Sequence, residues 1–405
     1  MMPGARLCGL LGLVVAIGTS ETFADELFDA CAASAASKFE PGYEDTGPVG
    51  IGAFNTYDAI QSCSVALAED PANIQLMAWL GNAYAADSQM DKAVPLLESA
   101  AAQGNAVALR ALGDLLILGK GMSRDEVRGV DLLNQAAAQN FAPAALSLGY
   151  SYEFGDGVQA DPETATRWYL TAADAGVVRA QLILAHRYQS GIGASQDDVE
   201  AFKWLERAAS TGDGEAQYLI GVAWLEGRGT GQSDAEALAA FQASADAYYA
   251  RGLTALGYMT ELGIGIEANV DDAAQLYMSA RGNNVAVAKY NLARLEDDGP
   301  DSLANPADAR QLYLDAAKAG ELRAGVNLAL MLIEGRGGPQ DLDAAFHWTE
   351  VAAKGGNPAG LNNLGRLYEL GLGTSVDMAL ARRFYGEAAD LGYQPAIDNL
   401  ARIGG

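Results

Sequence analysis

The sequence predicts an all-α fold, a right-handed superhelical α-solenoid of stacked helical hairpins. An aliphatic residue followed by a small one recurs every 36 residues, from Leu112-Gly113 to Leu400-Ala401, without a single insertion. A second small residue stands four positions before each of these pairs, as Ala144 does before Leu148. Two columns in one register over this length indicate a repeat array and argue against several unrelated globular domains.

Each repeat is predicted to be two helices, because its apolar residues fall on helical faces. In the repeat around Leu148, the first face contains positions i, i+4, i+5 and i+8. The second helix begins after Asp161-Pro162, a common start signal, and its aromatic residue is expected to fill the space between neighbouring hairpins. The residues of the two faces in this repeat are Ala144, Leu148, Gly149, Tyr152, Ala165, Trp168, Ala172 and Ala173.

Two glycines follow the first helix of each repeat. Gly155 has a counterpart in all eight repeats, and Gly157 in all but one, where Asp301 stands instead. A loop that binds phosphate is not normally needed eight times in one chain. Because glycine takes positive φ without steric cost, we interpret these residues as helix C-caps and turn residues.

The pattern AxxxLGxxYxxGxG followed by AxxWxxxAAxxG resembles the Sel-one-like repeat (SLR), a relative of the tetratricopeptide repeat. The resemblance covers residues 105–392 as eight repeats, and residues 393–405 form a partial capping helix. Two repeats depart from the pattern. Residues 213–248 carry Ala240 in place of tryptophan, and residues 285–320 carry Glu296 in place of tyrosine.

Residues 1–24 are expected to be a cleaved export signal. Arg6 precedes an apolar run from Leu7 to Ile17, and cleavage after Ala24 fits a small-residue site. This predicts a periplasmic protein, with secretion as the alternative. No later stretch reaches 18 apolar residues, so stable membrane insertion is not expected.

Residues 25–104 resemble tetratricopeptide units and contain Cys31 and Cys63, the two cysteines left after cleavage. In an exported protein such a pair most simply forms one disulfide, and two free thiols are the alternative. A bridge would fasten the first helix to the array as an N-terminal cap. The Gly/Pro-rich segment between the two cysteines, residues 40–56, is a second candidate binding surface.

No cofactor, catalytic residue or metal ligand is predicted. His186 and His347 lack ligand partners at a suitable spacing, and no hydrolase, zincin or phosphate-loop motif occurs. Asp297, Asp298 and Asp301 lack the alternation of a calcium loop and are expected to be solvated. The net charge of −26 argues against binding to nucleic acid or to an anionic membrane.

The resemblance implies a concave face lined by the first helices, and therefore a protein partner. Tyrosine and arginine are enriched in interface cores. The alternative is that many of these side chains pack between repeats. By tetratricopeptide geometry the candidate partner groove contains Arg110, Asp114, Leu146, Tyr150, His186, Tyr218, Tyr258, Tyr290, Arg294 and Arg366.

The function that the resemblance implies is a non-catalytic periplasmic scaffold or adaptor for protein–protein interaction. Typical settings are an envelope signalling system or an exopolysaccharide system. Two alternatives remain. One is an envelope enzyme or a β-lactam- or peptidoglycan-binding SLR protein, although no S-x-x-K motif occurs. The other is a secreted protein that interacts with a host or a surface.

Overall fold

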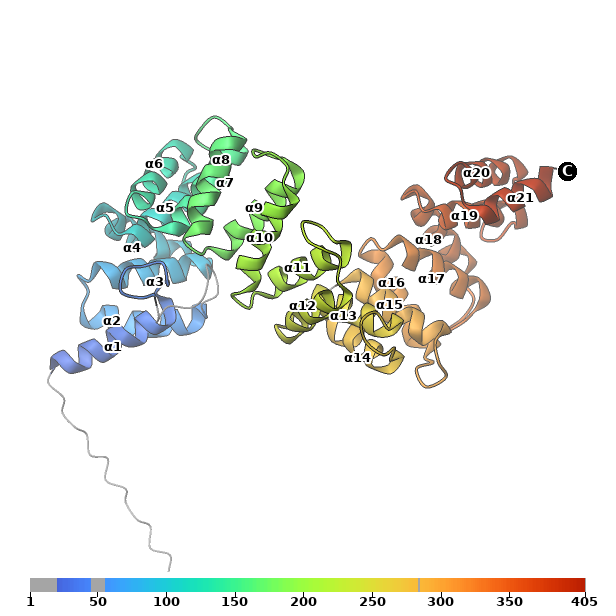
Figure 1. Cartoon of the computed structure of the whole chain (residues 1–405), viewed down its shortest axis with the longest axis horizontal. Helices are drawn as coiled ribbons and strands as arrows, with labels where there is room; N and C mark the ends of the chain where they lie inside the picture. The colour runs from blue at the N-terminus through green and yellow to red at the C-terminus, as the bar shows by residue number, and fades with distance from the viewer. Residues whose placement is uncertain (1–19, 45–54, 283–284, 405) are drawn as a thin grey trace, which may run out of the picture. The chain divides into compact units, whose positions relative to one another are not determined.

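The computed structural model describes residues 20–44, 55–282 and 285–404, which form 21 α-helices and no strand (Figure 1). Residues 1–19 of the predicted export signal lie outside this description, and residues 20–24 belong to the first helix. The helices are α1 Ser20–Ala35, α2 Thr56–Glu69, α3 Ile74–Ala86, α4 Met90–Ala102, α5 Ala106–Leu118, α6 Glu126–Ala137, α7 Ala142–Phe154, α8 Pro162–Asp174, α9 Val178–Ser190, α10 Asp198–Ala209, α11 Gly214–Glu226, α12 Asp234–Asp246, α13 Ala250–Leu262, α14 Val270–Arg281, α15 Ala286–Asp298, α16 Pro306–Lys318, α17 Leu322–Glu334, α18 Leu342–Lys354, α19 Pro358–Leu370, α20 Met378–Asp390 and α21 Gln394–Gly404.

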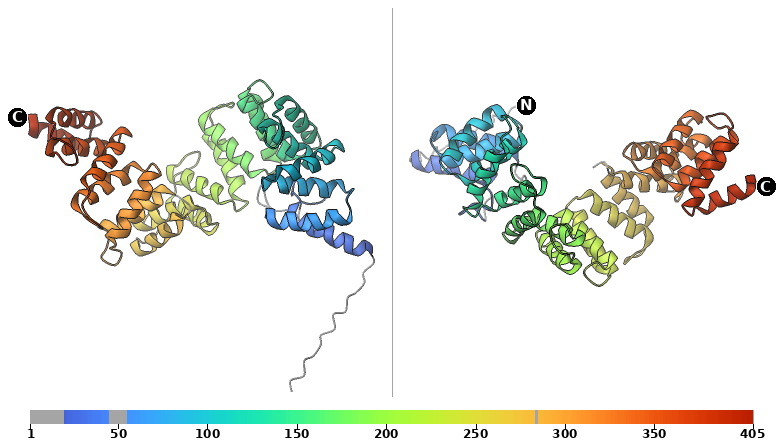
Figure 2. Two further views of the ribbon diagram at one scale, coloured as in Figure 1. Left: turned by 180° about the vertical axis from the view of Figure 1, so that it is seen from behind. Right: turned by 90° about the horizontal axis from the view of Figure 1, so that it is seen from above.

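Within each of two units, every helix packs against the helices that precede and follow it in the chain. We call the odd-numbered helices from α3 onward A-helices and the even-numbered helices from α4 onward B-helices. The chain divides into an N-terminal unit, residues 1–197, and a C-terminal unit, residues 198–405. Within each unit, consecutive hairpins stack side by side (Figures 1 and 2). This confirms the predicted all-α array of stacked hairpins.

The first glycine after an A-helix is a left-handed C-cap in seven of the eight repeats, as predicted. Gly155 is an example, with φ of 79°. Gly299 is the exception, because its backbone is extended there. The second glycine has a further role. A Cβ on Gly157 would lie 2.4 Å from the carbonyl oxygen of Glu126, so the loop rests against the start of the preceding B-helix.

Where the small residue of the A-helix is glycine, a B-helix side chain of the same hairpin packs against it. The ring of Tyr169 is fully buried, and a Cβ on Gly149 would lie 2.3 Å from it. Tyr277 and Gly257 repeat this contact. Trp168 is half-buried and packs against the preceding hairpin, as expected. The fully buried ring is therefore one position later than the tryptophan, in a column that we did not predict.

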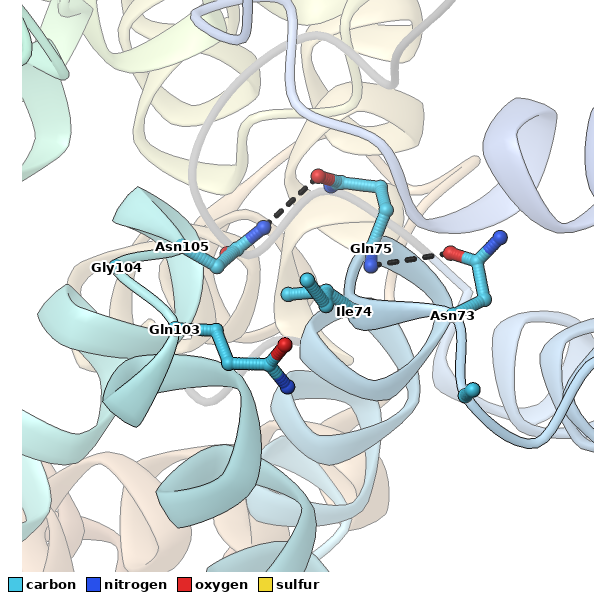
Figure 3. Close-up of a pocket in the computed structure, with 7 residues that line it drawn as sticks. Asn73, Ile74, Gln75, Gln103, Gly104 and Asn105 are labelled. Atoms are coloured by element: carbon cyan, nitrogen blue, oxygen red, sulfur yellow. Dashed lines mark hydrogen bonds between the residues drawn. The ribbon is translucent and has the colours of Figure 1, made fainter.

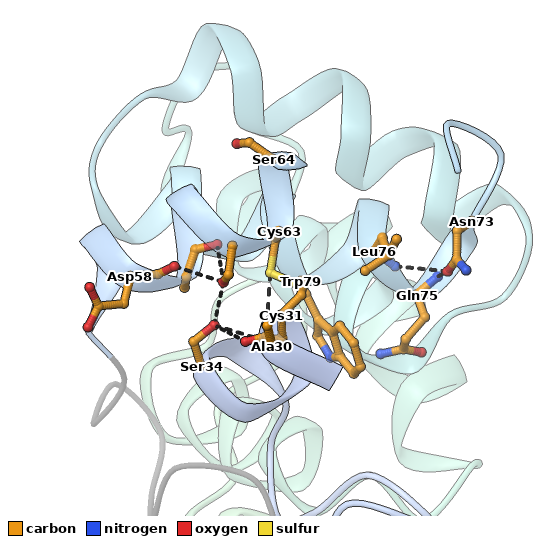
Figure 4. Close-up of a disulfide and its surroundings, with 12 residues drawn as sticks. Ala30, Cys31, Ser34, Asp58, Cys63, Ser64, Asn73, Gln75, Leu76 and Trp79 are labelled. Carbon is orange, nitrogen blue, oxygen red and sulfur yellow. Dashed lines mark hydrogen bonds between the residues drawn. A yellow bond between two sulfur atoms is a disulfide. The ribbon is translucent and has the colours of Figure 1, made fainter. Parts of the chain in front are cut away.

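Helix α1 is fastened to α2 by the predicted disulfide between Cys31 and Cys63 (Figure 4). Both cysteines are fully buried. Beside the bridge, the hydroxyl oxygens of Ser34 and Ser62 lie 2.6 Å apart. Most of the predicted loop that follows, residues 45–54, lies outside the described residues.

Candidate functional site

In each unit, a stripe of side chains runs along the A-helices, and we call this surface the A-face. It consists of the positions six before, three before and one after the small residue of each aliphatic–small pair. These positions are i, i+3 and i+7, so they share one side of the helix. In α5 they are Val107, Arg110 and Asp114.

The predicted groove residues occupy two of these three columns. The column that we missed is the first one, which holds an arginine in the third, fifth and seventh of the eight repeats. A spacing of 72 residues between arginines was the available signal in the sequence. The members of this column are Val107, Pro143, Arg179, Glu215, Arg251, Val287, Arg323 and Ala359.

In the N-terminal unit, the A-face brings together an aromatic pair and an arginine. The rings of Tyr150 and Phe154 stack nearly parallel with centroids 6.4 Å apart, and Phe154 is 68 % exposed. Arg179 Nε donates to the hydroxyl of Tyr150 at 3.4 Å. These contacts create an exposed edge that combines apolar surface with hydrogen-bonding groups.

The other predicted residues of this unit differ in their availability. Arg110 and Asp114 form an ion pair of 2.8 Å on one helix, and both are partly exposed. His186 is exposed, whereas Leu146 is buried. The predicted stripe therefore contains at least one residue that packs inside the array.

In the C-terminal unit, the A-face carries tyrosines together with arginines. Tyr258 is 47 % exposed. The Arg323 guanidinium lies over the ring of Tyr290, 4.5 Å from its centroid, and also pairs with Glu321 at 2.8 Å. This is a second tyrosine–arginine contact, made to the ring face and not to the hydroxyl. Tyr218 is half-buried beside Tyr249, with ring centroids 5.8 Å apart.

The two remaining predicted residues are arginines of this unit. Arg366 is exposed. Arg294 forms an ion pair with Glu261, and Glu261 also accepts a hydrogen bond from the Tyr277 hydroxyl at 3.0 Å. The side chain of Arg294 is therefore engaged in joining one hairpin to the next.

This combination of tyrosine, carboxylate and arginine recurs between hairpins. The Tyr385 hydroxyl donates to Glu369 at 2.7 Å, and Arg402 from the next helix pairs with the same carboxylate at 2.6 Å. Hydrogen bonds from Arg402 above all, and from Tyr385, lower the pKa of Glu369 to about 2. Glu261 and Glu369 each stand four positions after the small residue of their A-helix. Both join one hairpin to the next and are not free for a partner.

The acidic loop corrects one expectation. The side chain of Asp297 is only 2 % exposed and pairs with Arg336, so the prediction that it is solvated is wrong. The prediction holds for Asp298, which is exposed. The neighbouring Glu296 takes the place of an aromatic residue and is buried, and its Oε2 has no hydrogen-bond partner. Burial, followed by the charge of Asp308, raises the pKa of Glu296 to about 7.

The start of the array carries two recesses that no sequence feature predicted. One, of about 490 Å³, lies between the first turns of α3 and α5. Asn105 Nδ2 donates to Gln75 Oε1 at 2.8 Å along its wall (Figure 3). The other, of about 320 Å³, shares Gln75 and Asn105 and lies between residues 39–43 and Gln139–Phe141, just before α7. Amide side chains make up most of the lining of the first recess, whereas the second also has aromatic and aliphatic walls.

Within residues 20–44, 55–282 and 285–404, no group of three or more histidine, cysteine, aspartate or glutamate side chains is placed to hold a metal ion. Among the helices of these same residues, none is long and apolar enough to cross a membrane.

Two solved structures with clear likeness to the chain are SLR proteins. A protective antigen of uropathogenic Escherichia coli that displays an SLR fold is 25% identical, with a TM-score of 0.69, and the alignment covers 94% of this chain and 82% of that one. A Sel1 repeat protein from Oxalobacter formigenes is 26% identical, with a TM-score of 0.54, and the alignment covers 60% and 96%. No curated protein matches the chain.

The family model of the Sel1 (Sel-one-like) repeat matches most of the chain. The first match falls within the region that the sequence assigned to tetratricopeptide-like units. The matches are residues 78–105, 106–141, 142–177, 178–213, 214–249, 250–280, 286–321, 324–357 and 358–393. Because these matches cover well over half of the sequence, the chain belongs to the Sel1 repeat family.

Proposed function

We propose that this protein is a non-catalytic adaptor of the periplasm that binds a protein partner on its A-face. Sel1 repeat proteins generally mediate protein–protein interactions, and their fold is typically an interaction scaffold without catalysis. The observation that carries the proposal is the recurrent tyrosine–arginine contact on the A-face, seen for Tyr150 with Arg179 and for Tyr290 with Arg323. Rigid aromatic rings and planar guanidinium groups are the usual anchors of protein interfaces.

Photo-crosslinking in cells tests the binding surface. A photoreactive phenylalanine replaces Tyr150 or Tyr258, both on the A-face. The matched control replaces Tyr57, which is 69 % exposed on α2, away from the A-face. We expect the two A-face positions to crosslink the same partner, whereas position 57 does not. Equal crosslinking from all three positions would remove the support for the A-face.

The periplasmic location is supported by the predicted export signal and by the Cys31–Cys63 disulfide, since such bonds persist in oxidising compartments. Fractionation tests it: the chain is expected in an osmotic-shock fraction with the two cysteines oxidised. Recovery from the culture medium would favour secretion instead. An envelope signalling or exopolysaccharide system is the setting implied by the family, and the identity of the crosslinked partner tests that step.

A further inference from the structure

The segment Ser37–Tyr43 leaves α1 and returns over α3 and α5. Phe39 packs against the hydrophobic cluster that contains Val107, and the Tyr43 ring meets the Trp79 ring edge-on at 5.1 Å. Its own backbone hydrogen bonds are local turns, from Glu40 N to Ser37 O and from Tyr43 N to Glu40 O. Side chains therefore hold the segment on the helices.

Glu40 anchors the segment. It is 6 % exposed, and its carboxylate accepts hydrogen bonds from Trp79 Nε1 at 3.0 Å and from Gln75 Nε2 at 2.6 Å. The backbone N–H of Ser37 donates a third, at 2.6 Å. Gln75 and Trp79 are one turn apart on α3, so the two side chains form a neutral receptor for a carboxylate. Burial raises the pKa of Glu40 above its usual value.

This receptor lies at the beginning of the A-face. Val107 belongs to the first A-face column and is buried where the segment lies, whereas Arg179 in the same column of the same unit is exposed. The segment fills the region incompletely, because the recess of about 320 Å³ remains between Phe39, Tyr43 and the start of α7. The covered surface is thus larger than the segment that occupies it.

We propose that Ser37–Tyr43 is a built-in ligand, and that the site formed by Gln75 and Trp79 binds an acidic segment of the partner in its place. The partner segment carries a glutamate or aspartate between aromatic residues, because this is the chemistry that the site already holds. The inference rests on the proposed function, since it requires a protein partner on the A-face. Exchange is feasible because the incoming carboxylate regains both side-chain donors that Glu40 leaves.

A peptide provides the probe for this site. A fluorescently labelled peptide with the sequence of residues 37–44, Ser-Lys-Phe-Glu-Pro-Gly-Tyr-Glu, is titrated into the full chain and followed by fluorescence anisotropy. In the variant Phe39→Ala/Glu40→Ala the resident segment no longer competes. We expect the peptide to bind this variant about tenfold or more tightly than it binds the wild type.

Two matched controls identify the receptor. Adding Gln75→Leu to the double variant is expected to weaken peptide binding about tenfold, as is replacing the first glutamate of the peptide by alanine. The single variant Glu40→Gln keeps the size and one acceptor of the side chain, so it is expected to bind the peptide less tightly than the double variant. Equal affinity for wild type and double variant, or no effect of the alanine peptide, overturns the proposal.

A measurement on the unmodified chain keeps the proposal testable if the double variant does not fold. Excess unlabelled peptide is expected to speed hydrogen exchange in Ser37–Tyr43 of the wild type, and unchanged exchange overturns displacement. If the wild type is a dimer and Glu40→Ala is a monomer, the site binds a second copy of this chain, and the proposal of a different partner protein is refuted. Crosslinking at Tyr150 without peptide binding refutes only this inference, whereas peptide binding without A-face crosslinks refutes the proposed function.

Discussion

Arg187 is a buried cation that connects three helices of the N-terminal unit, and we expect its loss to destabilise that unit. Its side chain is 2 % exposed. Its guanidinium donates to Glu153 of α7 at 3.0 Å, and to the Thr166 hydroxyl and the Pro162 carbonyl of α8, both at 2.9 Å. The substitution Arg187→Met retains much of the apolar stem and removes all three hydrogen bonds.

The magnitude follows from what each acceptor loses. The Glu153 side chain is 31 % exposed, so water compensates part of its charge. The Pro162 carbonyl keeps the hydrogen bond from Thr166 at 2.9 Å. Removing one partner of a fully buried pair costs about 3–5 kcal/mol, and hydrogen bonds to charged groups are worth about 1.5–3 kcal/mol each. With partial compensation, we expect the free energy of unfolding to fall by about 2–4 kcal/mol.

Urea unfolding followed by tryptophan fluorescence measures this loss, because Trp168 lies on α8, the helix that supplies Thr166 and Pro162 to Arg187. Arg167→Met is the matched control. Arg167 is exposed and donates to Thr164 at the surface, so its loss is expected to change stability by no more than about 0.5 kcal/mol. A loss below about 1 kcal/mol for Arg187→Met, or one equal to the control, would refute the idea that this cation holds the hairpins together.

Three further outcomes are expected. Folding keeps the proton on Glu296 up to a pKa of about 7, whereas the unfolded chain releases it near 4.5, so this group makes stability fall as pH rises between these values. The free energy of unfolding of Glu296→Gln, from thermal denaturation, is therefore expected to equal that of the wild type near pH 4 and to exceed it by about 1–3 kcal/mol near pH 8. Equal stability of the two proteins at both pH values would show that ionisation of a buried Glu296 does not destabilise the wild type. Gly229→Ala is expected to cost about 2–4 kcal/mol in urea unfolding, because φ is +73° and the new Cβ would lie 1.9 Å from a carbonyl oxygen of α10. Gly231→Ala, with nothing within 4 Å, is the control that should stay neutral. Tyr248 is 83 % exposed with φ of 56°, where most other repeats have glycine, so Tyr248→Gly is expected to stabilise by about 0.5–1 kcal/mol, and a loss would mean that the ring makes essential contacts.

The repeat made most of the fold predictable, because a helical face repeated eight times averages out local ambiguity. What it could not decide is which ring of a neighbouring pair is fully buried. Trp168 and Tyr169 both follow Ala165 on the inner side of α8, at i+3 and i+4. Tyr169 occupies the centre because Gly149 leaves space opposite it, and that is a contact between two helices. The only sign of this contact in the sequence was the glycine or alanine of each A-helix, which faces the B-helix position that Tyr169 occupies.

The candidate site was less predictable, because its residues serve two purposes. Arg294 and Arg366 stand in the same column, yet one is paired across hairpins and the other is exposed. The residue 33 positions earlier, on the preceding A-helix, is Glu261 for Arg294 but Ile333 for Arg366, so only Arg294 has a carboxylate in that position. The segment around Glu40 could not be placed from the sequence for another reason. It occurs once, so no periodicity marks the side of the array on which it lies.

Each of these glycine loops contacts the start of the preceding B-helix, and this contact limits how the gene can change in length. Gly157 rests against Glu126, and Gly193 rests in the same way against Pro162. Deleting one whole block of 36 residues, such as 142–177, would place the loop of the next repeat against the equivalent position of the B-helix before the deletion. A deletion within the array that is not a whole multiple of 36 residues would leave a loop without this contact. Inherited variants of this protein are thus expected to differ by whole blocks, through recombination between neighbouring copies.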